Sequence, residues 1–376
     1  MRIAIVGCGY VADYYLKTLP GYSELELAGV LDHDNERSSK FAAHYSVPVY
    51  HCLEELLEDR SIDIVLNLTN PKSHFSVSKA CLDAGKHVYT EKPLAMEVSE
   101  AEKLVDLAEQ RGLYISSAPC SLLSETAQTL WKALRENVVG QVRLVYAEMD
   151  DGLVHRMPYK KWLNDSGTPW PYKDEFEVGC TLEHAGYSLT WLLAFFGPVK
   201  TVTAFSSCLI PDKQTDVLLD VNAPDFSVAC IKFESGVVAR LTCSIVAPHN
   251  HAFQIFGDEG VLCVDDCWYY EAPVYTRESI NIGRKRLEGV WKKRYPLVRK
   301  ASPRIQYRGA HRMDFLRGVA ELASAITEQR PCRLSARFSL HVNEVVLAIN
   351  NALETSSTYK ISSSFEPIEP MPWAKS

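Results

Sequence analysis

Several features of membrane, secreted and nucleic-acid-binding proteins are missing from this 376-residue sequence. No run of about 18 apolar residues is present, as a membrane-spanning helix would need, and the opening MRIAIVGCG lacks the regions of a signal peptide. None of the 11 cysteines forms a CxxC pair. The formal net charge of −7 argues against general nucleic-acid binding. We therefore expect a cytoplasmic protein with reduced thiols, no metal site, and neither a membrane nor a nucleic-acid partner.

The chain is long enough for two domains, and 47% hydrophobic residues can fill two cores. Up to residue 120, short apolar runs alternate with helical patterns. The apolar runs are residues 2–6, 25–31, 62–68, 87–90 and 113–117, and the helical patterns include 36–44, 73–84 and 99–111. This alternation is typical of parallel strands joined by helical crossovers. We predict an α/β domain with a parallel sheet over residues 1–120.

After residue 120 the pattern changes to consecutive strands with few helices between them. The expected strands are residues 141–149, 199–209, 226–233 and 237–246, and the expected helices are 124–137, 310–328 and 338–354. Strands that follow one another through short turns favour a mixed or antiparallel sheet. We predict an α+β domain over residues 121–355 and, because the end is proline-rich, an extended tail over 356–376.

The first apolar run leads into a glycine motif that reads G-x-G-x-x-A. Its residues are Gly7, Cys8, Gly9, Tyr10, Val11 and Ala12. The first glycine allows a tight turn, the second lets a pyrophosphate approach the backbone, and the small last residue allows close helix–strand packing. A helix beginning here directs its positive end at the phosphates.

Asp32 closes the second apolar run, at the spacing expected for a carboxylate that binds the adenosine ribose hydroxyls. A carboxylate there repels a 2′-phosphate, so the sequence favours NAD over NADP. Two alternatives remain: a glycine turn followed by an exposed aspartate, and a flavin in place of the nicotinamide.

A second stretch, GKHVYTEKP at residues 85–93, is the most specific in the chain. Together with the glycine loop it resembles the Gfo/Idh/MocA family of oxidoreductases, over about residues 2–350. The segment from Thr69 to His74 looks like the family's TPxxxH segment, with Asn70 where proline is usual. The resemblance implies a Rossmann domain followed by an α+β domain whose open, predominantly antiparallel sheet makes an oligomer interface. It also implies that Thr69, Asn70, His74, Glu91 and Lys92 lie at the cofactor.

Within Glu91-Lys92-Pro93, the resemblance places the family's catalytic lysine at Lys92. An ammonium group there can donate hydrogen bonds to the substrate hydroxyl and stabilise the alkoxide that precedes hydride transfer. The alternative is a surface ion pair between Glu91 and Lys92.

The rest of the catalytic set is expected in the segment from Gly179 to Tyr187. The family carries an aspartate and, four residues later, a histidine, and this chain has Glu183 and Tyr187 at those positions. A spacing of four places both side chains on one helix face. Tyr187 then transfers the proton if the ammonium of Lys92 lowers its pKa from about 10. His184 is the alternative base or a substrate ligand, and a packed aromatic remains the other interpretation of Tyr187.

Two further segments have a substrate-side interpretation. Residues 155–176 form a long stretch rich in proline and aromatics, in which Trp162 and Trp170 can stack on a sugar or base. The alternative is an interdomain loop packed for stability. Residues 284–317 hold twelve Lys or Arg and two acidic residues. That stretch is consistent with a site for a phosphorylated or nucleotide-linked substrate, with a protein partner or acidic polymer, or with a solvated insertion.

The resemblance therefore implies an NAD-dependent enzyme that transfers hydride between nicotinamide and a secondary alcohol or ketone of a sugar, sugar derivative or nucleotide sugar. Lys92, Glu183, His184 and Tyr187 are the expected catalytic and substrate-binding residues. The assembly is expected to be a homo-oligomer, a dimer or a tetramer. Two alternatives stay open on the same scaffold: a redox-assisted glycosidase or elimination enzyme with tightly bound NAD, and a non-catalytic regulator that senses a dinucleotide.

Overall fold

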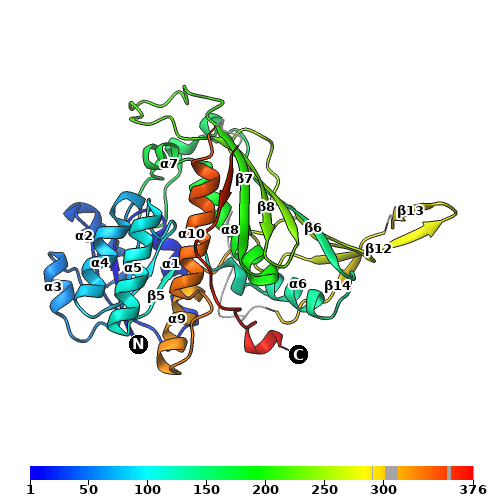
Figure 1. The fold of residues 1–376 in the computed structure, drawn as a ribbon. Helices are drawn as coiled ribbons and strands as arrows, with labels where there is room; N and C mark the ends of the chain where they lie inside the picture. The colour runs from blue at the N-terminus through cyan, green and yellow to red at the C-terminus, as the bar shows by residue number, and fades with distance from the viewer. Residues whose placement is uncertain (290, 301–311, 354–356, 376) are drawn as a thin grey trace.

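A computed structural model describes residues 1–289, 291–300, 312–353 and 357–375. It contains two sheets, one built from the first part of the chain and one from the remainder (Figure 1). Among these residues, no helix combines the length and the apolarity that crossing a bilayer requires.

The first sheet has five parallel strands in the order β2-β1-β3-β4-β5. Its strands are β1 (Arg2–Val6), β2 (Glu26–Leu31), β3 (Ile64–Asn67), β4 (His87–Thr90) and β5 (Ile115–Ser117). Its helices are α1 (Ala12–Thr18), α2 (Asn35–Tyr45), α3 (Leu53–Glu58), α4 (His74–Asp83) and α5 (Val98–Arg111). The chain reverses its direction of travel across the sheet between β2 and β3, so the carboxyl ends of β1 and β3 flank the crevice in which such folds bind ligands. The predicted Rossmann sheet is confirmed.

The second sheet has ten strands within the described residues, in the order β13-β12-β11-β10-β6-β9-β8-β7-β15, with β14 paired to β12. The strands are β6 (Val142–Asp150), β7 (Val199–Ser207), β8 (Phe226–Phe233), β9 (Val238–Ser244), β10 (Phe253–Gly257), β11 (Gly260–Val264), β12 (Val274–Ile282), β13 (Lys285–Glu288), β14 (Lys293–Tyr295) and β15 (Thr358–Lys360). Only the pairing of β6 with β9 is parallel among these ladders. The predominantly antiparallel sheet is therefore confirmed.

One face of this sheet is covered by helices. The remaining helices are α6 (Glu125–Arg135), α7 (Tyr172–Val178), α8 (Cys180–Phe196), α9 (Arg317–Thr327) and α10 (Ala336–Asn350). Helix α8 packs on β6, β8 and β9, and α10 packs on β7 and β8. Along β7 and β8 every second side chain is buried, while intervening ones such as Phe205 and Cys230 point away from the helices.

Helix α10 joins the two halves of the molecule. It packs on α8 and β7 on one side and on α5 and β5 on the other (Figure 1). One continuous group of buried side chains runs from Ile3 and Tyr89 of the first sheet to Trp191 of α8 and Val345 of α10. The two sheets therefore share a hydrophobic core.

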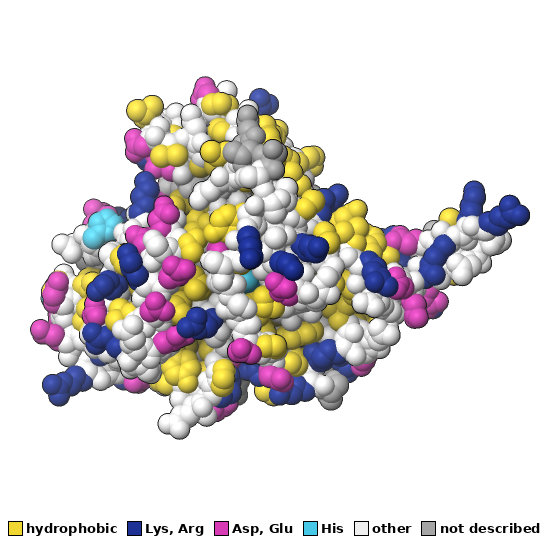
Figure 2. Space-filling model, viewed as in Figure 1, with side chains coloured by type: hydrophobic (Ala, Val, Ile, Leu, Met, Phe, Trp, Pro, Cys, Tyr) yellow, Lys and Arg dark blue, Asp and Glu magenta, His cyan; other side chains and the backbone are white. Residues whose placement is uncertain are grey.

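The strands β12 and β13 form an arm that projects from the second sheet (Figure 1). Exposed Arg284, Lys285 and Arg286 lie near its tip, and Figure 2 shows basic side chains gathered there. Other cations of the basic stretch are paired elsewhere, as in the buried ion pair of Arg317 with Glu125 at 2.9 Å. The described part of residues 284–317 is therefore divided between the arm and the core, and residues 301–311 lie outside the described residues.

Two predicted elements differ in detail. The helix expected over 310–328 begins only at Arg317, and residues 312–316 before it are not helical. The tail expected to be extended also contributes strand β15, in which Tyr359 lies opposite Val202 of β7.

Candidate functional site

The glycine loop connects β1 to α1 at the carboxyl edge of the first sheet. Gly7 has φ +102°, and a Cβ on it would lie 2.5 Å from the carbonyl oxygen of Leu68, so this turn requires glycine. A Cβ on Gly9 would meet nothing within 4 Å. The space beside Gly9 is where the backbone can receive a pyrophosphate, and these residues therefore fit the dinucleotide that the motif predicts.

Asp32 lies just beyond the end of β2 and faces this loop. It accepts a hydrogen bond of 2.7 Å from the amide of Cys8 and two from Arg37, at 2.9 and 2.7 Å. Burial would raise the pKa of Asp32, but these bonds and the amide of Asp34 outweigh burial and lower it. The carboxylate is thus ionised and already fixed in place. The sequence analysis did not predict a role for Arg37, because only its two hydrogen bonds to Asp32 in the structure reveal one.

His74 is completely buried and holds two neighbouring segments together. Its Nδ1 lies 2.7 Å from the carbonyl oxygen of Pro93 and its Nε2 lies 3.0 Å from that of Thr69. Burial lowers its pKa. The imidazole therefore fixes the loop after β3 to the backbone beside Lys92. Among its neighbours, Thr69 is half-buried and Asn70 is exposed.

Glu91 links the strand β4 to the first helix of the cofactor domain. Its carboxylate accepts a hydrogen bond of 2.7 Å from the hydroxyl of Tyr15 in α1 and one of 3.0 Å from the amide of Lys92. Glu91 is buried, so it is not the surface partner of Lys92 that the sequence left as an alternative.

The ammonium of Lys92 instead hydrogen-bonds the carboxylate of Glu183 in α8. Burial would lower the pKa of Lys92, but the negative charge of Glu183 raises it above its ordinary value. Burial likewise opposes ionisation of Glu183, and Lys92 lowers the pKa of that carboxyl overall. The two residues thus form a largely buried ion pair that joins the Rossmann domain to the second domain.

Glu175, the fourth residue of α7, is a further member of this group. It hydrogen-bonds Glu183, and burial together with the charge of Glu183 raises its pKa well above its usual range. A protonated Glu175 can donate to the Glu183 carboxylate and leave the other oxygen to Lys92. The sequence carries no motif at Glu175, and only the packing of α7 on α8 reveals it.

Tyr187 follows Glu183 by one helical turn and is also buried. Its ring packs against that of Trp268, with 5.2 Å between the ring centres. The sequence analysis expected Lys92 to lower its pKa. Lys92 does act in that direction, but burial outweighs it and the pKa of Tyr187 is raised. The phenol therefore stays protonated near neutral pH.

His184 lies one position after Glu183. Its Nδ1 is 3.0 Å from Oδ2 of Asp151, a residue that directly follows β6. Its ring contacts Trp268, with 5.6 Å between ring centres. The carboxylate of Asp151 therefore faces this imidazole, although the two atoms do not align for a hydrogen bond.

The segment 155–176 lies across the glycine loop. The side-chain amide of Asn164 donates hydrogen bonds to the carbonyl oxygens of Gly9, at 3.4 Å, and Tyr10, at 3.2 Å. The amide of Ser166 donates to Asp13 at 2.9 Å, and Lys17 pairs with Asp165 at 3.2 Å. This segment is thus a strap from the second domain over the first turn of α1.

The two tryptophans predicted for substrate stacking lie in the strap and pack on one another. Their ring centres are 5.1 Å apart, and Trp170 also contacts Tyr159 and Phe176. Both indoles are half-buried. Their contacts fit the packing alternative that the sequence left open for this segment.

A Rossmann sheet with a glycine loop, a carboxylate after β2 and a lysine–glutamate pair between the domains is typical of an oxidoreductase that uses a nicotinamide dinucleotide. Residues 1–118 match the family model described as an oxidoreductase family with an NAD-binding Rossmann fold. Residues 127–263 match the Gfo/Idh/MocA C-terminal domain. The chain belongs to the Gfo/Idh/MocA family, as its sequence resemblance implied.

The chain is similar to curated and structurally characterised members of that family. It is 26% identical to the trans-1,2-dihydrobenzene-1,2-diol dehydrogenase of Bos taurus over 71% of this chain and 75% of the relative. The WlbA dehydrogenase of Bordetella pertussis, in complex with NADH and UDP-GlcNAcA, superposes with TM-score 0.73 and 16% identity over 96% of this chain and 98% of that one. A 3-ketoreductase variant from Actinomadura kijaniata, in complex with TDP-benzene and NADP, gives TM-score 0.70 and 19% identity over 95% and 97%.

Proposed function

We propose that the protein is an NAD(H)-dependent dehydrogenase or reductase acting on a secondary alcohol or ketone of a sugar or sugar derivative. The observation that carries the proposal is the largely buried Lys92–Glu183 ion pair between the Rossmann domain and the second domain. Two similar proteins support this class of substrate. One is named as a dihydrodiol dehydrogenase, and the other is a dehydrogenase in complex with a nucleotide sugar.

The dinucleotide supplies the hydride or accepts it, and the chain's residues handle the oxygen and the proton. Lys92 donates a hydrogen bond to the substrate oxygen and stabilises the negative charge that develops there during the reaction. Glu183 keeps the ammonium charged and, with the protonated Glu175 behind it, fixes its direction. An ion pair held in this way requires little rearrangement when the substrate binds.

Tyr187 is the acid and base of this proposal. Its phenol remains protonated, so it donates the proton when a ketone is reduced, and by microscopic reversibility it takes the proton back when the alcohol is oxidised. The imidazole of His184, which lies beside Asp151, is the alternative proton carrier for both directions. Tyr187 and His184 both lie on α8, and both of their rings contact Trp268.

We also propose that NAD is the preferred dinucleotide, because Asp32 lies at the ribose position. Arg37 occupies both oxygens of this carboxylate and offsets its charge. An arginine in this place can accept a 2′-phosphate, so the preference for NAD over NADP is expected to be modest.

The strap favours one of the alternative functions, a redox-assisted elimination or glycosidase reaction with a retained cofactor. Such a reaction oxidises the substrate transiently and returns the hydride, so the dinucleotide has no need to leave. The contacts from Asn164 to Gly9 and Tyr10 close the loop from outside. A non-catalytic regulator, by contrast, has no need of the buried pair of Lys92 and Glu183.

For the assembly, we propose a homo-oligomer that forms through the outward face of the second sheet. That face presents Phe205 of β7, a residue that is 39% exposed, and on the central strands β6 and β9 the paired, partly exposed Tyr146 and Arg240. Phe205→Glu should shift the protein to a smaller species in light scattering, and Lys200→Glu at the exposed start of β7 is the matched control.

Turnover with a defined cofactor tests the proposed reaction. Purified protein should oxidise or reduce members of a panel of free sugars, sugar acids and nucleotide sugars with NAD(H), monitored at the nicotinamide absorbance. Lys92→Ala should lose this activity and keep dinucleotide binding. Product formed without net change in NADH, together with cofactor that survives gel filtration, would identify the elimination reaction instead.

A further inference from the structure

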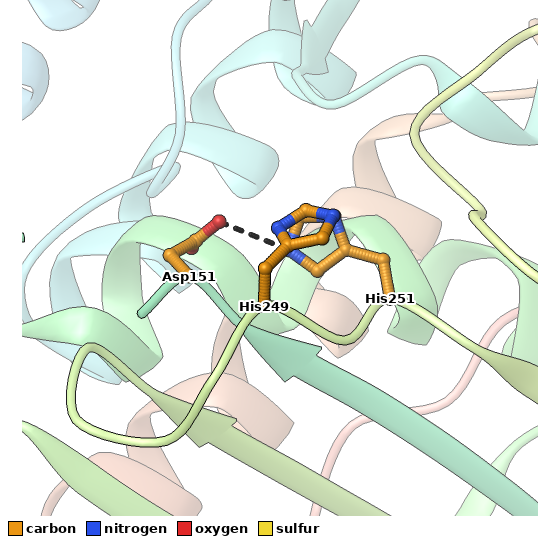
Figure 3. A group of neighbouring side chains, drawn as sticks. All are labelled: Asp151, His249 and His251. Carbon is orange, nitrogen blue, oxygen red and sulfur yellow. Dashed lines mark hydrogen bonds and ion pairs between the residues drawn. The ribbon is translucent and has the colours of Figure 1, made fainter. Parts of the chain in front are cut away.

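A group of imidazoles and carboxylates lies beside the proposed site, and two of its members, His249 and His251, have no role in the proposed hydride transfer. Figure 3 shows Asp151, which follows β6, with His249 and His251 from the segment before β10. One ligand atom from each of these three residues lies within 4.8 Å of the others. The rings of His249 and His251 have centres 4.2 Å apart.

Several buried atoms of this group lack a hydrogen bond. Oδ1 of Asp151 bonds to Nε2 of His251 at 2.9 Å. Oδ2 of Asp151 and Nδ1 of His184 are only 3.0 Å apart but do not align for a hydrogen bond, and neither has another partner among the described residues. Nδ1 of His251, on a side chain without exposed surface, is likewise without one. Unpaired buried polar atoms are costly, and an ion is one of their recognised causes.

The ligand atoms of these residues lie close enough to converge on one small cation. Nitrogen and oxygen ligands lie about 2.0–2.2 Å from zinc, so neighbouring ligand atoms of a tetrahedral site are about 3.3–3.6 Å apart. Asp151 and His251 are closer than this, at 2.9 Å, and the ligand atom of His249 lies within 4.8 Å of both. Small side-chain rotations, in which the 59% exposed His249 moves inward, would give the three atoms the spacing of a metal site.

The neighbouring charge also favours a cation. Asp266 lies 3.6 Å from Nδ1 of His251 and 3.5 Å from Nε2 of His249, and its other contact is the amide of Trp268 at 2.9 Å. A carboxylate behind metal-bound imidazoles orients the rings and strengthens them as ligands. Asp151 and Asp266 together supply two negative charges to a group whose other members are imidazoles.

We propose that Asp151, His249 and His251 bind one divalent transition-metal ion, with His184 available as a further donor. Imidazole nitrogen combined with a single carboxylate suits zinc, iron, cobalt or nickel and does not suit magnesium or calcium, which prefer oxygen. The ion would hold His184 of α8 against the second sheet. The ring of Trp268 contacts His251, with centres 4.3 Å apart, and also contacts Tyr187, so the site adjoins the proposed acid.

Metal binding can be tested without any substrate. Full-length protein is treated with a chelator and dialysed, then titrated with Zn²⁺ by calorimetry and with Co²⁺ by visible absorption. We expect one ion per chain and a Co²⁺ spectrum typical of nitrogen and oxygen ligands. His249→Ala should weaken binding at least tenfold, and because His249 is largely exposed the variant should fold. His51→Ala removes an exposed histidine elsewhere and should leave binding unchanged.

Two results would overturn the proposal. One is an affinity for Zn²⁺ and Co²⁺ that is the same in His249→Ala as in the wild type. The other is a wild-type protein that binds no ion after dialysis, in which case His251 is a protonated imidazolium between Asp151 and Asp266. Loss of hydride-transfer activity plays no part in either result, so failure of the proposed reaction leaves this test intact.

Discussion

Replacing Tyr187 by phenylalanine removes one hydroxyl and leaves the aromatic packing on Trp268 in place. An ordinary tyrosine has a pKa of about 10, so about one molecule in a thousand is ionised at pH 7. Burial raises the pKa of Tyr187, so the ionised fraction is smaller still. The group therefore acts as an acid, and the variant should slow ketone reduction by about 10²–10⁴-fold, or about 2.7–5.4 kcal/mol of barrier.

Single-turnover measurement of NADH oxidation with the best ketone of the panel gives this rate directly. In the wild type, the rate of reduction should not fall between pH 7 and about 10, because the phenol keeps its proton throughout. His184→Asn is the matched control: it keeps the phenol of Tyr187 and should slow both directions of the reaction far less than Tyr187→Phe does. Full activity of Tyr187→Phe in reduction, with loss of both directions in His184→Asn, would show that His184 alone moves the proton.

Four further outcomes are expected. Lys92→Ala should reduce turnover at least ~100-fold, the scale for one donor to an oxyanion, while fluorescence titrations show that dinucleotide binding is retained. Near-normal turnover of this variant would show that the active site lies elsewhere. Glu175→Gln should keep most activity, since its raised pKa already makes the carboxyl neutral, whereas a large loss would show that Glu175 works ionised. Asp32→Ala should narrow the preference for NAD, and Arg37→Ala should widen it, in paired titrations with NAD and NADP; opposite shifts would refute the assigned roles. Asn164→Ala should release cofactor faster during gel filtration. Unchanged cofactor retention in this variant would show that the strap does not hold the cofactor.

The parts of the site that follow from local sequence were predictable. The turn at Gly7, the carboxylate of Asp32 at the end of β2 and the helical spacing of Glu183 and Tyr187 each depend on residues close together in the chain. Their periodicity and turn chemistry identify the elements that carry them.

The remaining features depend on contacts between distant segments. Glu175 meets Glu183 only because α7 folds back on α8, and Asn164 reaches Gly9 from more than 150 residues away. The pKa of Tyr187 was expected to fall because Lys92 is near, but the depth of burial, which raises it, is set by the whole surrounding core. Sequence periodicity carries no information on such packing.

The hydrophobic core shared by the two sheets has a consequence for recombining family members. Helix α10, near the end of the chain, fills space beside α5 and β5, and Ala95 of the first domain donates its amide to Asn343 at 3.4 Å. A chimaera that joins the first 120 residues to another relative's second half must therefore match side-chain volumes across this seam as well as preserve the active site. Exchange of the α10 surface along with the Rossmann domain would keep the two sets of volumes together, and the natural unit for grafting is then discontinuous in the gene.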